Sequence, residues 1–261
     1  MPPRKRRNLI KCKLKGSPER WVKRCLEFFR GVGEYNPTVE STEPQEDDLY
    51  EVLTILSLNH LQYDTDVRSS DFLDPGFDVG VELFCRFWRD QTNRQKRDTD
   101  WWKPFRNSLL LGLLAERWDE LDGICQWVQA DLDPGYIGET KADYIFVKVI
   151  LSVAAGLRES KMRALASMEK KIIDSRMPGP VALFEAWDAA RNNDQAGFEK
   201  GMTTALKQFS AQRGERFVVL EWIALHESIV NLAARRLGLK HPELPPELDA
   251  YLMTPETIEN N

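Results

Sequence analysis

Apolar residues recur along this chain at helical spacing, and residues 101–128 show the pattern most fully. The first half of this stretch, residues 101–115, is apolar on nearly every side, which is typical of a helix buried within other protein. The second half has apolar residues at i, i+3, i+4 and i+7, the spacing of one face of an amphipathic helix: Leu121, Ile124, Cys125 and Val128. We therefore predict a buried helix and an amphipathic partner, joined by a tight turn at residues 116–118.

The same pattern recurs downstream. A mostly apolar stretch at residues 142–157 breaks at 158–160, and another helical stretch breaks at 191–193, after which Asp194 is the expected N-cap. The turns near Glu116, Arg158 and Arg191 are about 42 and 33 residues apart, within the range of helical repeats. Because no strand-like alternation competes with this pattern, the sequence predicts an all-α fold. Its architecture is predicted to be stacked antiparallel helical hairpins in an irregular helical-repeat-like bundle.

The domain organisation follows from composition along the chain. Residues 1–16 form a basic arm, which we interpret as a flexible, solvated segment. Residues 17–252 are predicted to form a single all-helical domain, and a division into two lobes near residues 89–100 stays open as an alternative. A last long helix ends at Gly238, a natural position for a helix-ending glycine, and a short helix is expected near 247–252. Residues 253–261 are assigned to a C-terminal tail.

The charge balance and the apolar runs exclude several classes of protein. The net charge of −5 makes a nucleic-acid binder less favoured, since phosphate binding requires a basic face. The longest apolar run is about seven residues, which is too short to span a membrane. The chain shows no signal-peptide pattern, and its scattered cysteines indicate a reducing compartment. We therefore expect a cytoplasmic protein.

The sequence contains no complete catalytic or metal-binding motif. His60, His226 and His241 are far apart in sequence and have no ligand spacing. His226–Glu227 resembles the start of an HExxH zinc motif, but Val230 stands where the second histidine is required. We therefore interpret His226 as a core or interface histidine, and expect no metal, no cofactor and no enzymatic activity. A helical enzyme with a pocket near His226 and Glu227 is the weaker alternative.

Two acidic clusters are the remaining functional candidates. The first lies where a polar loop leads into a helix, and the second surrounds a turn. Acidic clusters are usually solvated faces, but complementary charge also speeds encounter with a basic protein and selects it. The candidate partner-binding residues are Glu46, Asp47, Asp48, Glu51, Asp131 and Asp133.

Three stretches resemble the immunity protein 49 family of bacterial polymorphic-toxin systems. They are the hairpins SLLLGLLAERWDELDGICQWV and ALFEAWDAARNNDQAGFEKGMTTAL, and the late helix EWIALHESIVNLAARRLGL with its tail HPELPPELDAYL. The resemblance covers roughly residues 45–252 and consists of helix and turn patterns, so no functional residues are carried over from it.

The resemblance implies a cytoplasmic, all-helical, non-enzymatic immunity protein of a toxin–antitoxin pair. Such a protein binds a cognate bacterial toxin, for which a basic nuclease is one candidate, and neutralises it by protein–protein interaction. The alternatives are a general helical-repeat scaffold for protein interaction and an unrecognised helical enzyme. A concave groove lined by exposed aromatic or Asn and Arg side chains would favour the scaffold.

Overall fold

A computed structural model of the chain describes residues 52, 53, 56, 57, 60, 73, 74, 76–81, 102–117, 119–121, 178–212 and 223–258. Within these ranges the chain is helical or forms turns and connections, without any strand, so the predicted all-α class is confirmed for this part. The named helices are α5 (Trp102–Leu114), α9 (Pro178–Arg191), α10 (Gln195–Gln212), α11 (Leu225–Arg236), α12 (Pro246–Asp249) and α13 (Pro255–Ile258).

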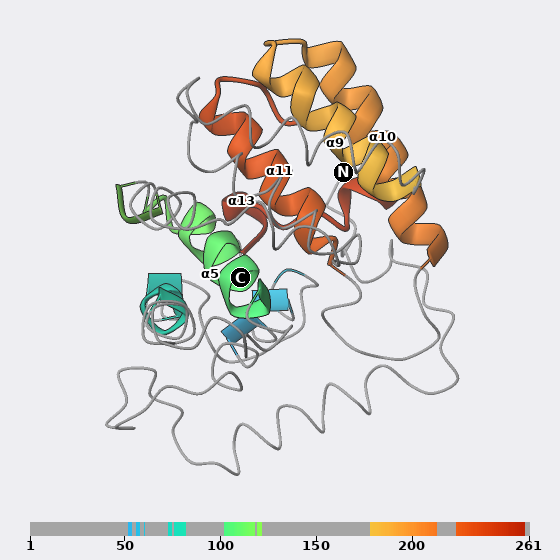
Figure 1. The fold of residues 1–261 in the computed structure, drawn as a ribbon. Coiled ribbons are helices and arrows are strands. Elements are labelled where there is room, and N and C mark those ends of the chain that lie inside the picture. Colours follow the sequence, from blue (N-terminus) through green and yellow to red (C-terminus); the bar gives the residue numbers. More distant parts are fainter. Residues whose placement is uncertain are drawn as a thin grey trace, which may run out of the picture.

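Helices α9 and α10 form an antiparallel hairpin (Figure 1). The predicted break at 191–193 is confirmed, and so is the N-cap, because the Gly197 N–H donates to Asp194 Oδ1 over 3.0 Å. The two helices approach closely at Gly201, where an added Cβ would lie 2.7 Å from the Cα of Ala186. The hairpin is therefore fixed at its turn by the N-cap and packed closely where Gly201 meets Ala186.

Three helices end in the same type of turn, in which the residue after the C-cap adopts a positive φ. These residues are Glu116 after α5 (φ 56°), Asn193 after α9 (φ 55°) and Gly238 after α11 (φ 97°). The following residue then donates its N–H to a carbonyl in the last helical turn: Arg117 to Gly112 (2.9 Å), Asp194 to Ala189 (2.8 Å) and Leu239 to Ala234 (3.2 Å). These are Schellman motifs, and they confirm the three helix ends predicted near 116, 191 and 238.

Helix α11 lies between the hairpin and α5 (Figure 1) and packs against α5, α9 and α10. Its residues 227–234 are all buried. Residues 107–114 of α5 are buried as well, which agrees with the prediction that this helix is apolar on nearly every side. The core of the described part of the chain is therefore built around these two helices.

The segment 239–258, here called the strap, crosses α11 after the turn at Gly238 and contains α12 and α13. Its backbone joins α11 at two points: Ala224 N–H donates to the Tyr251 carbonyl (3.0 Å), and Met253 N–H donates to Ser228 Oγ (2.9 Å). The short helix expected near 247–252 is present as α12, slightly earlier. Strap residues 248 and 250–254 are buried, so the strap is part of the core.

Several predicted features lie outside the described residues. They are the basic arm, the division near 89–100, the amphipathic partner helix beyond residue 121, the apolar stretch 142–157 and the break at 158–160. Across the helices that are described, none is both long and apolar enough to cross a membrane.

Candidate functional site: a groove on the α9–α10 hairpin

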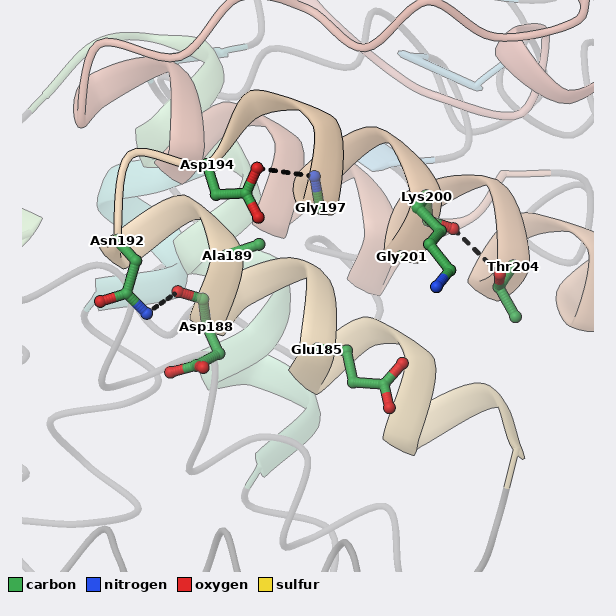
Figure 2. A pocket seen from close by; sticks show the side chains of 9 residues that line it. All are labelled: Glu185, Asp188, Ala189, Asn192, Asp194, Gly197, Lys200, Gly201 and Thr204. Carbon is green, nitrogen blue, oxygen red and sulfur yellow. Dashed lines mark hydrogen bonds between the residues drawn. The ribbon is translucent and has the colours of Figure 1, made fainter.

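A groove of about 310 Å³ runs between α9 and α10 on the side of the hairpin that faces solvent (Figure 2). Its walls come from one face of each helix together with the turn between them. The lining residues are Glu185, Asp188, Ala189, Asn192, Asp194, Gly197, Lys200, Gly201 and Thr204. We call this feature the hairpin groove.

The sequence of each helix explains why the groove forms here. On α9, Ala182, Ala186 and Ala190 face the interior, so that Glu185 and Asp188 are left exposed. On α10, Gly197 and Gly201 carry no side chains, so the backbones of α9 and α10 approach each other closely at the floor of the groove. The result is a shallow polar depression with an acidic wall along α9.

The groove is predominantly negative. Three exposed carboxylates line it, those of Glu185, Asp188 and Asp194, against one lysine, Lys200. Asp188 accepts a hydrogen bond from Arg191 over 2.7 Å, and this pair is partly exposed. With Lys200 and Arg191 counted against the three carboxylates, one negative charge is left over at the groove.

Local hydrogen bonds keep the neutral polar groups of the groove close to their own helices. Asn192 Nδ2 donates to the Asp188 carbonyl (2.9 Å), and Thr204 Oγ1 donates to the Lys200 carbonyl (2.9 Å), as Figure 2 shows. These side chains therefore cap their own backbone. Of the carboxylates, Asp194 accepts from the Gly197 N–H and Asp188 accepts from Arg191, so each offers its remaining acceptor positions to an incoming molecule.

The described surface as a whole, the groove included, is also acidic. The exposed carboxylates are Asp74, Asp78, Glu116, Asp119, Glu120, Glu185, Asp188, Asp194, Glu243, Glu247 and Glu256. The exposed lysines and arginines are Lys200, Lys207, Arg236 and Lys240. The acidic excess of the sequence is therefore displayed on the surface of this part of the chain.

A second candidate, the pair His226–Glu227, lies in the first turn of α11. Glu227 is 8% exposed, and burial raises its pKa to about 7. Nε2 of His226 is buried, and burial, followed by the charge of Arg106, lowers the pKa of His226 well below its ordinary value. This agrees with the prediction of a core or interface histidine. Burial therefore acts against the charged form of both side chains, and neither lines the hairpin groove.

The other two histidines have structural partners. His60 forms hydrogen bonds through both ring nitrogens, Nδ1 with Thr257 Oγ1 (2.9 Å) and Nε2 with the Ala250 carbonyl (2.8 Å). His241 lies between Asp249 Oδ1 (2.7 Å) and Asn231 Nδ2 (3.3 Å). No three His, Cys, Asp or Glu residues of the described ranges come together as a potential metal site.

The six acidic residues proposed from the sequence, at positions 46, 47, 48, 51, 131 and 133, all lie outside the described residues. The hairpin groove was missed, because its residues were interpreted only as the helices on either side of a turn. A signal was present in the sequence: Glu185, Asp188 and Asn192 recur at i, i+3 and i+7, opposite the apolar face of Leu183 and Trp187.

Comparison with known proteins gives no relative from which to transfer a function. No protein family, curated protein or solved structure matches the chain.

Proposed function

We propose that this chain is an immunity protein that binds a cognate bacterial toxin with a basic surface and neutralises it by protein–protein contact. The observation that carries the proposal is the acidic hairpin groove, with Glu185, Asp188 and Asp194 exposed on a rigid helical frame. The resemblance to the immunity protein 49 family supports the same function. The proposal includes a cytoplasmic location, a non-enzymatic mechanism and stacking of the hairpins into a bundle.

The charge of the groove favours a basic partner. A groove lined by one sign of charge attracts molecules of the opposite sign, and raises the rate of encounter more than the final affinity. A single exposed pair contributes little, on the order of 0–1 kcal/mol, so selection depends on several carboxylates acting together. The hairpin groove provides three of them within one short hairpin.

The rigidity of the hairpin also favours binding. Its turn is fixed by the Schellman motif at Asn193 and by the Asp194 N-cap, and its helices are in close contact at Gly201. A surface that is already ordered loses less conformational entropy on binding than a flexible one. A preformed acidic face is therefore suited to capturing a toxin quickly and covering its active site.

The proposal can be tested by co-purification from the native host, with identification of whatever stays bound at moderate salt. A groove variant, Glu185→Lys with Asp188→Asn, is compared with a matched strap variant, Glu243→Lys with Glu247→Asn, whose residues are also exposed and lie outside the groove. We expect one toxin-like protein, released by higher salt, lost at least tenfold by the groove variant and retained by the strap variant.

Other outcomes would change the proposal in defined ways. Retention of the toxin by the groove variant would move the contact surface elsewhere, and Glu46→Lys, Asp47→Lys and Asp48→Lys would then be tested together. Recovery of many housekeeping proteins would favour the general scaffold. If no protein is retained, the immunity function is wrong, and the region around His226 and Glu227 becomes the place to look for an activity.

A further inference from the structure

The strap holds α10 in its first turn and in its last turn. At the first residue of α10, Gln195 Oε1 accepts from the Lys240 N–H over 3.0 Å, and Gln195 Nε2 donates to the Lys240 carbonyl over 3.3 Å. In the last turn, Tyr251 Oη lies 3.2 Å from Ser210 Oγ, and the Tyr251 ring packs edge-on against Phe209 with 5.4 Å between ring centroids. The strap therefore fixes the helix that forms one wall of the hairpin groove.

The side chain of Gln195 pairs with Lys240 as one peptide group pairs with another. A primary amide carries both a donor and an acceptor, so a single glutamine can bind the N–H and the carbonyl of one residue. Its Nε2 also donates to Glu199 Oε1 over 2.8 Å, one turn further along α10. Glutamate would lose these donors, and alanine would lose donor and acceptor together. The pairing is therefore specific to an amide at this position.

The strap side of this pair is held in place by its neighbours. Lys240 follows Leu239, whose N–H donates to the Ala234 carbonyl in the turn that ends α11. It precedes His241, which forms a hydrogen bond with Asp249 over 2.7 Å. Lys240 is therefore a fixed point to which the start of α10 is attached.

On the other side, the pair stands next to the end of the groove at the hairpin turn. Asp194, the residue before Gln195, lines the groove and accepts from the Gly197 N–H, as Figure 2 shows. Gln195 does not line the groove itself. It therefore acts on the groove through the position of Asp194 and of the first turn of α10.

We propose that Gln195 is a positioning residue of the hairpin groove, which holds Asp194 opposite the carboxylates of α9 by binding both backbone groups of Lys240. Because the groove is the proposed contact surface for the toxin, this inference rests on the proposed function. Without the pair, the start of α10 is released from the strap, and the three carboxylates no longer keep one arrangement. Binding in the groove then depends on a residue that the bound molecule does not touch.

The test titrates a hexa-arginine peptide into the full chain at low salt and follows the Gly201 amide by NMR, so that no toxin has to be identified. Gln195→Ala should weaken binding of the peptide about fivefold, the factor that corresponds to one typical hydrogen bond. Hydrogen exchange of the Lys240 amide checks the pair itself, and its rate should rise at least fivefold in the same variant.

Gln195→Glu separates position from charge. An added carboxylate beside an acidic groove would by itself strengthen binding of a cationic peptide. This carboxylate, however, has no donor for the Lys240 carbonyl and is repelled by Glu199, so we expect binding to weaken. An acidic residue in the first turn also favours the helix, so denaturant unfolding should show that α10 is not destabilised more than in Gln195→Ala.

Gln208→Ala is the matched control, because Gln208 is also a half-buried glutamine of α10, and it should bind the peptide as the native chain does. The inference is overturned if Gln195→Glu binds the peptide as tightly as the native chain or more tightly. Unchanged binding or unchanged Lys240 exchange in Gln195→Ala would overturn it as well. Native affinity in Glu185→Lys with Asp188→Asn would instead show that the groove is not the contact surface, and both proposals would then lose their site.

Discussion

Arg235 in the last turn of α11 binds Glu256 in α13 through two parallel hydrogen bonds, from Nη2 to Oε1 over 2.6 Å and from Nη1 to Oε2 over 3.1 Å. The guanidinium holds the pKa of the Glu256 carboxyl at about 2, well below its ordinary value of 4.5. This bidentate pair fastens the last helix of the strap to the end of α11.

Glu256→Gln should lower the free energy of unfolding at neutral pH by about 1 kcal/mol. This is less than the full pKa shift of Glu256 would give, because the pair is partly exposed and screened by solvent. Since the folded pKa is depressed, the stabilisation is present above pH 4.5 and is lost as pH falls towards 2. Denaturant unfolding of both chains at neutral pH and near pH 2 checks this. Equal stabilities at neutral pH would contradict it, and Glu247→Gln, at an exposed position of α12, is the control.

Glu116→Gly should stabilise the protein by about 1 kcal/mol, because Glu116 has a φ of 56°, a conformation that strains residues with a Cβ. Gly238→Ala should destabilise it by about the same amount. Gly238 has a φ of 97° with no atom near its Cβ position, so the loss there is purely conformational. Thermal unfolding of the two variants measures both effects. Changes of the same sign would show that the positive φ at these positions does not determine the stability of the turns.

Gly201→Ala should destabilise the hairpin by about 1–3 kcal/mol, because its new Cβ would lie 2.7 Å from backbone atoms of Ala186 and force the helices apart. Gly179→Ala is the matched control. Its Cβ would meet only Gln208 at 3.8 Å, an ordinary contact. Pro180 follows and disfavours a helical residue with a Cβ before it, so we expect at most a loss smaller than that of Gly201→Ala. Chemical denaturation compares the two, and an equal effect at both positions would rule out close packing as the cause.

Local features of the described helices were predictable from the sequence. The apolar run of residues 109–114 indicated a buried helix, and the breaks at 116–118 and 191–193 indicated turns. These signals are local because a helix of period 3.6 and its end are set by residues within two turns of each other. The same reasoning placed the end of α11 at Gly238.

The groove and the strap contacts were not predictable in this way. The groove depends on which faces of α9 and α10 meet, and that is decided by the approach at Gly201 and not by the pattern of either helix alone. The two partners of His241, Asn231 and Asp249, come from different elements, and the tertiary fold alone brings them together. The sequence therefore indicated acidic surfaces in general, but not this groove.

The bond between His60 and the Ala250 carbonyl has a consequence for synthesis of the chain. The two residues are 190 positions apart, and at typical translation rates this separation corresponds to about 10–40 s. During that interval the imidazole of His60 has no access to its native acceptor. The part of the core that contains this hydrogen bond is therefore completed only after Ala250 has been translated.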